Sequence, residues 1–172
     1  MPRLLIVRHA IAQDRDEAYA QHRSDADRPL TDKGRRRMQQ VAAGIHCEAG
    51  QLEQILSSPL LRAHQTAEIL SRQYPETPLT ITDSLSPGQS LPSLVEELAA
   101  TSHGGAVAIV GHEPDLSSLI ALLVFRNEQA AIQLKKGGAA LLDFPHRIAI
   151  GNGVLLWLLT PGQLRKLGSN NR

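Results

Sequence analysis

The sequence is poor in cysteine and in aromatic residues. Cys47 is the only cysteine among 172 residues, and Phe, Trp and Tyr together make up 3% of the chain. A single cysteine excludes an internal disulfide framework and a cysteine-rich zinc site. With so few aromatics, a core has to be built from aliphatic side chains, and the hydrophobic content of 42% is sufficient for this.

The chain also lacks an excess of charge and a long apolar run. Lys and Arg number 18 against 17 Asp and Glu, which gives a formal net charge of +1 and argues against binding to nucleic acid or to anionic lipid. The longest apolar stretches, residues 119–125 and 154–159, fall far short of the ~20 residues of a membrane helix, and the N-terminus has no secretory pattern. We therefore expect a cytoplasmic protein, with one domain over residues 1–167 and a disordered polar tail at 168–172.

Apolar periodicity alternates between strand and helix along the chain. Short apolar runs predict strands at residues 4–7, 54–56, 79–81, 106–110, 139–144 and 154–159. Amphipathic spacing predicts helices beginning at Thr31 and at residues 61–74, 91–100 and 115–124. Turn residues 151–153 predict a hairpin between the last two strands. The pattern favours a three-layer αβα sandwich, with a mostly parallel sheet and an antiparallel hairpin at its C-terminal edge.

Basic and imidazole side chains follow three of the predicted strands. Arg8 and His9 follow the first strand, Arg62 lies one helical turn after the second, and His112 follows strand 106–110. Ligands bind beyond the carboxyl ends of such strands, so we expect these four side chains to meet. The sequence has no Gly-rich phosphate loop, and the guanidinium groups would have to supply the donors for a phosphate. A neutral imidazole in this setting can act as a nucleophile toward phosphorus.

Four motifs resemble those of the histidine phosphatase superfamily, which has the phosphoglycerate-mutase-like fold. The compact length and the block beginning at Arg28 are most similar to the SixA-type phosphohistidine phosphatases. The resemblance spans residues 4 to about 160. The motifs are Arg8-His9-Ala10, Arg28-Pro29-Leu30-Thr31-Asp32-Lys33-Gly34, Ser57-Ser58-Pro59-Leu60-Leu61-Arg62-Ala63-His64-Gln65-Thr66-Ala67 and Val110-Gly111-His112-Glu113.

The resemblance implies a role for each motif residue. His9 is then the nucleophile that becomes phosphorylated, Arg8 and Arg62 hold the phosphoryl oxygens, and His112 donates to the transferring group. Arg28 would add a fourth contact. Neither a cofactor nor a metal is implied, and no His, Asp or Glu spacing argues for a metal.

The sequence departs from the family pattern at two places. Ala10 stands where glycine is usual, which matters if that position needs a positive φ. The stretch at residues 85–88 has no carboxylate where larger relatives carry a general acid. An imidazole leaving group needs less protonation than an alkoxide, so this absence favours a phosphohistidine substrate. Glu113 is a candidate proton donor for an alternative reaction, and Asp83 is a weaker one.

The expected function is hydrolysis of phosphohistidine on a partner protein, such as a histidine-phosphotransfer domain, with inorganic phosphate as the product. The alternatives are a small-molecule phosphomonoesterase that uses Glu113 as its acid, and a non-catalytic phosphate-binding module. Ser58 is expected to be a turn or capping residue. The basic run at residues 33–37 is expected to be a solvated face, although it could attract an acidic phosphotransfer domain.

Overall fold

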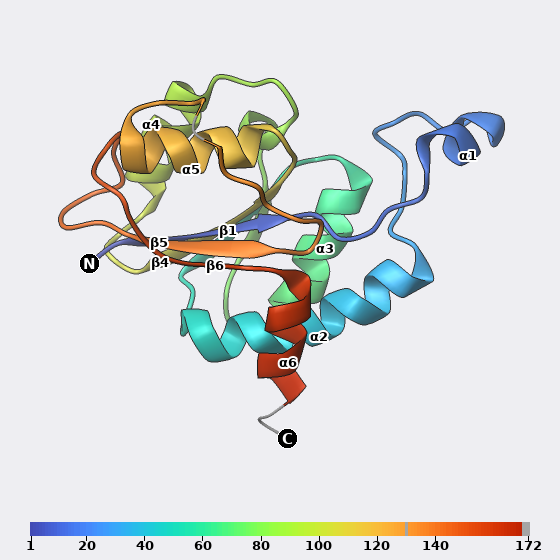
Figure 1. The fold of residues 1–172 in the computed structure, drawn as a ribbon, viewed down its shortest axis with the longest axis horizontal. Helices are drawn as coiled ribbons and strands as arrows, with labels where there is room; N and C mark the ends of the chain where they lie inside the picture. The colour runs from blue at the N-terminus through green and yellow to red at the C-terminus, as the bar shows by residue number, and fades with distance from the viewer. Residues whose placement is uncertain (130, 170–172) are drawn as a thin grey trace.

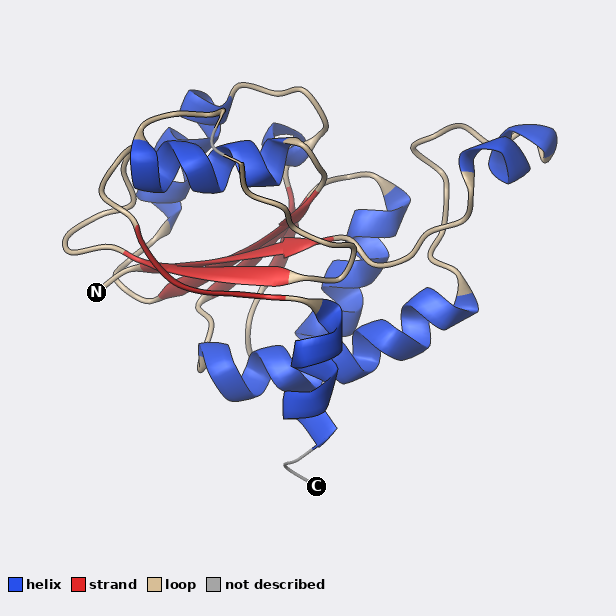
Figure 2. Cartoon of the chain, in the orientation of Figure 1, coloured by secondary structure: helices blue, strands red, loops and turns tan. Residues whose placement is uncertain are grey.

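The computed structural model describes residues 1–129 and 131–169 and shows one six-stranded sheet between two layers of helices (Figure 1, Figure 2). The sheet order is β3-β2-β4-β1-β5-β6. The strands are β1 (Arg3–Arg8), β2 (Gln54–Ser57), β3 (Leu79–Ile81), β4 (Ala106–Gly111), β5 (Ala139–Asp143) and β6 (Val154–Leu159).

The sheet is parallel from β3 to β1 and antiparallel at the other edge. β1 pairs in parallel with β4, in a register that sets Arg8 opposite Gly111. β5 pairs antiparallel with β1 and with β6. The predicted α/β class, the mostly parallel sheet and the antiparallel C-terminal hairpin are therefore confirmed. β1 and β4 lie in the middle and are almost wholly buried, which explains why both read as continuous apolar runs.

Helices cover both faces of the sheet and create two aliphatic cores. On one face, Met38, Ile45 and Leu70 pack against Leu5 and Val7. On the other face, the cluster includes Leu98, Leu119, Leu4 and Ile6. The helices are α1 (Arg15–Ala20), α2 (Asp32–Ala49), α3 (Leu61–Ser71), α4 (Leu91–Thr101), α5 (Asp115–Phe125) and α6 (Pro161–Ser169), with a short 3₁₀ turn at Asp83–Leu85.

Two helices were missed by the apolar periodicity. α1 has six residues and buries only Ala18, so it carries no amphipathic signal. α6 is attached to α2 largely through glycine, because a Cβ on Gly44 would lie 2.0 Å from the carbonyl oxygen of Leu164. α6 continues to Ser169 with Gly168 buried, so these two residues belong to a helix rather than to the expected tail. Residues 170–172 of that tail lie outside the described residues.

The carboxyl end of β1 leads directly into an arm that projects from the sheet. Residues 13–30 run outward from this strand end, carry α1 and return to α2 (Figure 1). The return is fixed by the Thr31 side chain, which caps α2 at the predicted start of this helix by accepting from the Gly34 N–H. In the described part of the chain, no helix has the length and apolar character to cross a bilayer.

Candidate active site

The ends of β1 and β4 and the first turn of α3 meet around one cavity of about 590 Å³. Arg8, His9, Arg62 and His112 all line it. The parallel register places Arg8 beside Gly111, so His9 and His112 follow neighbouring strand ends. Their ring centroids are 5.2 Å apart. The four side chains singled out in the sequence therefore lie together, and Arg28 and Glu113 line the same cavity.

His9 is held with one ring nitrogen bound and the other available. Its Nδ1 lies 2.8 Å from the carbonyl oxygen of Ala10. A carbonyl only accepts, so Nδ1 carries the proton and Nε2 keeps its lone pair. Burial, opposed by the Ala10 carbonyl and aided by the charges of His112, Arg62 and Arg8, lowers the pKa of His9 to about 3. The imidazole is therefore neutral at physiological pH.

The two arginines are each anchored by a backbone carbonyl and keep a buried donor free. Arg8 donates through Nη1 to the carbonyl oxygen of Leu134 at 2.8 Å, and Arg62 donates through Nη1 to that of Asp25 at 2.7 Å. In both residues, Nε is buried without a hydrogen-bond partner. Buried N–H donors on cations are costly to leave unpaired. An anion with several oxygen atoms would satisfy both.

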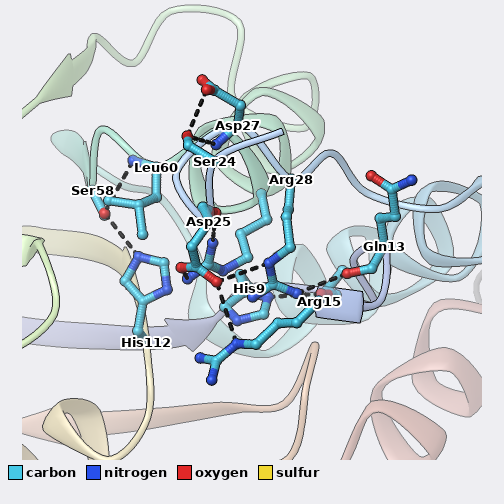
Figure 3. Close-up of polar contacts among 12 residues, drawn as sticks. His9, Gln13, Arg15, Ser24, Asp25, Asp27, Arg28, Ser58, Leu60 and His112 are labelled. Atoms are coloured by element: carbon cyan, nitrogen blue, oxygen red, sulfur yellow. Dashed lines mark hydrogen bonds and ion pairs between the residues drawn. The ribbon is translucent and has the colours of Figure 1, made fainter. Parts of the chain in front are cut away.

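His112 presents a third buried donor because Ser58 fixes its tautomer. The Ser58 hydroxyl oxygen accepts from the Leu60 N–H at 3.3 Å and lies 2.8 Å from His112 Nε2, as Figure 3 shows. The described residues offer this hydroxyl no other acceptor, so we assign its proton to the bond with Nε2 and the ring proton to Nδ1, which is buried and unpartnered. Burial, together with the charge of Arg62, lowers the pKa of His112 to about 4, so this donor is a neutral N–H. Sequence reasoning had placed Ser58 in a turn without this contact.

Comparison with known proteins identifies the family. Residues 4–86 match the model of the histidine phosphatase superfamily (branch 1). An uncharacterized protein from Picosynechococcus sp. is 36% identical over 137 residues, which cover 78% of this chain and 81% of the relative. The chain belongs to the histidine phosphatase superfamily.

Solved structures of several phosphatases share the fold of this chain. The protein histidine phosphatase SixA, complexed with tungstate, superposes with a TM-score of 0.79 at 24% identity, covering 94% of this chain and 99% of SixA. A phosphoserine phosphatase from Entamoeba histolytica superposes with a TM-score of 0.67 at 19% identity, covering 95% and 100% of the two chains. These likenesses confirm the phosphoglycerate-mutase-like architecture, and membership of the superfamily supports phosphatase activity.

Ala10 does not strain the loop that follows β1. The residue is absent from the positions with positive φ, so the loop does not need glycine there. The Ala10 N–H donates to Thr66 Oγ1 at 3.0 Å, and Thr66 Oγ1 in turn donates to the Arg62 carbonyl. This chain of contacts ties the residue after His9 to the helix that carries Arg62.

The two candidate proton donors are not aimed at the phosphate position. Both carboxylate oxygens of Glu113 accept from Ser117, one from its N–H and the other from its hydroxyl, so Glu113 caps the first turn of α5. Asp83 does not line the cavity. Pro87 is the cavity residue from the stretch that lacks a carboxylate. Among the described residues, no group of three or more His, Cys, Asp or Glu is arranged to hold a metal ion.

Asp25 is a site residue that sequence reasoning missed. Its carboxylate lies in the cavity within 3.0 to 3.2 Å of Arg28, Arg62 and Arg15 (Figure 3). Burial alone would raise the pKa of Asp25, but Arg62 and Arg28 outweigh it and hold the pKa below its ordinary value. Asp25 is therefore an ionised anchor for the arginines and not a proton donor. Arg28 also donates to the Gln13 carbonyl, so both anchors of its guanidinium come from the arm.

Proposed function

We propose that this protein is a phosphatase that removes the phosphoryl group from phosphohistidine on a partner protein, through a covalent phosphohistidine formed on His9. The observation that carries the proposal is that His9, with one free imidazole lone pair, lines a single cavity together with three residues that each hold a buried, unpartnered N–H donor: Arg8, Arg62 and His112. Transfer of a phosphoryl group requires a nucleophile and hydrogen-bond donors for the three phosphoryl oxygens.

The transfer proceeds in two steps with this arrangement. His9 Nε2 attacks phosphorus while Arg8 Nε, Arg62 Nε and His112 Nδ1 donate to the phosphoryl oxygens. The P–N bond of the substrate breaks, and its imidazole leaves and takes a proton from solvent. Water then attacks the phosphorus on His9, the new P–N bond breaks, and inorganic phosphate leaves. Donors that are already in place need no reorganisation as charge builds on these oxygens.

The absence of a positioned acid supports phosphohistidine over an alcohol ester. Loss of general acid catalysis typically costs on the order of 10²–10⁴-fold for a poor leaving group. Glu113 is committed to Ser117 and Asp25 is held ionised by its arginines. A substrate whose leaving group is an imidazole tolerates this, because imidazole departs more readily than an alkoxide. The likeness in fold to SixA, a protein histidine phosphatase, points in the same direction.

A comparison of two substrates tests the proposed function. We expect the protein to dephosphorylate an isolated histidine-phosphotransfer domain that has been phosphorylated with phosphoramidate, and to do so with a higher kcat/KM than for an alkyl phosphate such as phosphoserine. Higher kcat/KM for phosphoserine would make the protein a small-molecule phosphomonoesterase. Tight phosphate binding without turnover of either substrate would make it a phosphate-binding module.

A further inference from the structure

Four cations form a continuous surface beside the cavity, which we call the basic rim: Arg37, Lys136, Arg165 and Lys166. Lys136 lines the catalytic cavity and also a shallow neighbouring depression, which Arg37 and Arg165 line as well. Arg165 and Lys166 line the next depression along α6. The basic rim therefore begins at the mouth of the cavity that holds His9 and extends over α2 and α6.

The backbone fixes the basic rim relative to His9. The Gly137 N–H, next to Lys136, donates to the carbonyl oxygens of Arg8 and His9, both at 3.1 Å. The first turn of α2 lies against the chain after His9 so closely that a Cβ on Gly34 would be 2.1 Å from the Ile11 carbonyl oxygen. α6 is seated on α2 through Gly44 and Gly168, where a Cβ would also collide with the opposing backbone.

No carboxylate within the described residues neutralises the basic rim. Neither depression has an Asp or Glu in its lining, and no ion pair shorter than 4.0 Å involves any of the four cations. Arg37, Lys136 and Lys166 are exposed, and Arg165 is half-buried. The depression next to the cavity encloses only about 30 Å³, too little space for a small-molecule ligand, whereas the one between Arg165 and Lys166 encloses about 390 Å³ and is open to a protein side chain. An exposed and unpaired group of cations of this kind is typical of a surface that contacts another protein.

The arm, which also lines the cavity, has a small excess of negative charge. The arm at residues 13–30 contains five carboxylates and three arginines, which are Asp14, Asp16, Glu17, Asp25 and Asp27 against Arg15, Arg23 and Arg28. Asp14 and Asp16 line the cavity on the side of the arm. A molecule that approaches His9 therefore meets negative charge on the arm and positive charge on the basic rim. Such an asymmetry orients a large charged partner, because complementary potentials steer encounter and fix register.

Building on the proposed function, we infer that the basic rim is the docking surface for an acidic face of the phosphoprotein substrate. The acidic face of the partner would lie beside its phosphohistidine and contact Arg37 and Arg165, while the phosphoryl group enters the cavity past Lys136. A phosphorylated amino acid or small ester has no such acidic face, so the basic rim discriminates between protein and small substrates.

Charge reversal away from the catalytic residues tests this inference. The double variant Arg37→Glu/Arg165→Glu should lower kcat/KM for the phosphorylated histidine-phosphotransfer domain by about tenfold or more at low salt, through KM, because steering charges act mainly on association. Turnover of a small aryl phosphate should stay within about twofold of wild type. The gap between the double variant and wild type should close in about 0.5 M salt, where charges are screened over a few ångströms.

A matched control variant reverses the charge of two arginines at the other end of the sheet. Arg72 caps the carboxyl end of α3, and Arg147 follows β5, whose last residue, Asp143, pairs with Arg3 at the start of β1. Both are exposed. The variant Arg72→Glu/Arg147→Glu has the same net charge as the test variant and should keep wild-type kcat/KM for both substrates. In the complementary experiment, the acidic residues around the histidine of the phosphotransfer domain are replaced by Asn or Gln. Wild-type enzyme should then show the same decrease in kcat/KM as the rim variant shows with the unaltered domain.

The outcomes separate this inference from the proposed function. If wild-type enzyme dephosphorylates the domain and the rim variant does so equally fast, the docking surface is refuted and the proposed function stands. If wild-type enzyme hydrolyses aryl phosphate but leaves the phosphorylated domain intact, both are refuted. If the rim variant loses only binding to phosphatidylglycerol vesicles, the basic rim contacts membranes and the inference is wrong.

Discussion

Removal of the Ser58 hydroxyl is the perturbation that most specifically tests how His112 donates. In wild type, this fully buried hydroxyl lies 2.8 Å from Nε2 and keeps the ring proton on Nδ1. Ser58→Ala leaves a buried acceptor without its donor, at a cost of about 1–3 kcal/mol. Without the hydroxyl, nothing favours the tautomer with the proton on Nδ1, so part of the molecules carry the proton on Nε2 and lack the donor in the cavity.

The expected loss follows from that energy. Because the bond to the phosphoryl oxygen strengthens in the transition state, the effect should fall on kcat more than on KM. An energy of about 1–3 kcal/mol corresponds to a decrease in kcat of roughly fivefold to a hundredfold. Turnover of an aryl phosphate by purified enzyme measures it. Ser57→Ala is the matched control, because Ser57 is equally buried but donates to the Ser58 carbonyl and does not contact His112.

The pH dependence separates this role from simple packing. An imidazolium carries protons on both nitrogens, so the tautomer no longer matters once His112 is protonated. Burial and the charge of Arg62 lower the pKa of His112 to about 4. Loss of the Ser58 donor should raise that pKa, because a hydrogen bond donated to Nε2 stabilises the neutral ring. The ratio of wild-type to Ser58→Ala kcat should therefore shrink from pH 7.5 to pH 4.5. A constant ratio, or an equal loss of kcat in Ser57→Ala, would refute the assigned role.

Three further predictions concern the nucleophile, the helix contact and the acid. Burial, and to a smaller extent the charged neighbours, lowers the pKa of His9 to about 3. Below pH 6.5 the histidine is therefore protonated in the unfolded chain but not in the folded one, and this favours unfolding of wild type. His9→Asn should therefore gain stability relative to wild type by about 2 kcal/mol between pH 7.5 and pH 5, and a pH-independent difference in thermal unfolding would contradict this. Gly44→Ala should destabilise the fold by at least about 1–3 kcal/mol in urea because its Cβ meets the Leu164 carbonyl, whereas Gly162→Ala, with its nearest contact at 3.9 Å, should cost little. Glu113→Gln should keep kcat for the phosphorylated histidine-phosphotransfer domain within about threefold, and a loss of 10² or more would restore Glu113 as the acid.

Continuous or periodic apolar patterns explain which elements were predictable from the sequence. β1 and β4 are apolar on both faces because they are buried on both faces, and α2 shows a regular stripe ending in Ile45. α1 lacks such a signal because it buries only Ala18. α6 is short, buries Leu164 as its apolar side chain, and is otherwise seated on α2 through glycine contacts that no apolar pattern marks. The helix expected at residues 61–74 ends at Ser71, where a turn joins Tyr74 back to the Ser71 carbonyl.

The site was predictable where its residues follow strand ends or belong to one of the four motifs, as Arg62 and Arg28 do. Arg8, His9 and His112 are placed by the parallel register of β1 and β4. Ser58 and Asp25 act through contacts with segments 54 and 37 residues away in sequence. Such contacts depend on side-chain direction in the folded chain, so neither a spacing nor a composition signal marks them.

Direct detection of phosphate on His9 tests the central claim. Wild-type enzyme mixed with substrate should be quenched at alkaline pH within milliseconds, digested and analysed by mass spectrometry. We expect a phosphoryl group on the peptide that contains His9, stable to alkali and lost in acid, and we expect none in His9→Asn. Full turnover by wild type with no phosphorylated peptide at any time, or with the phosphate on His112, would contradict the account.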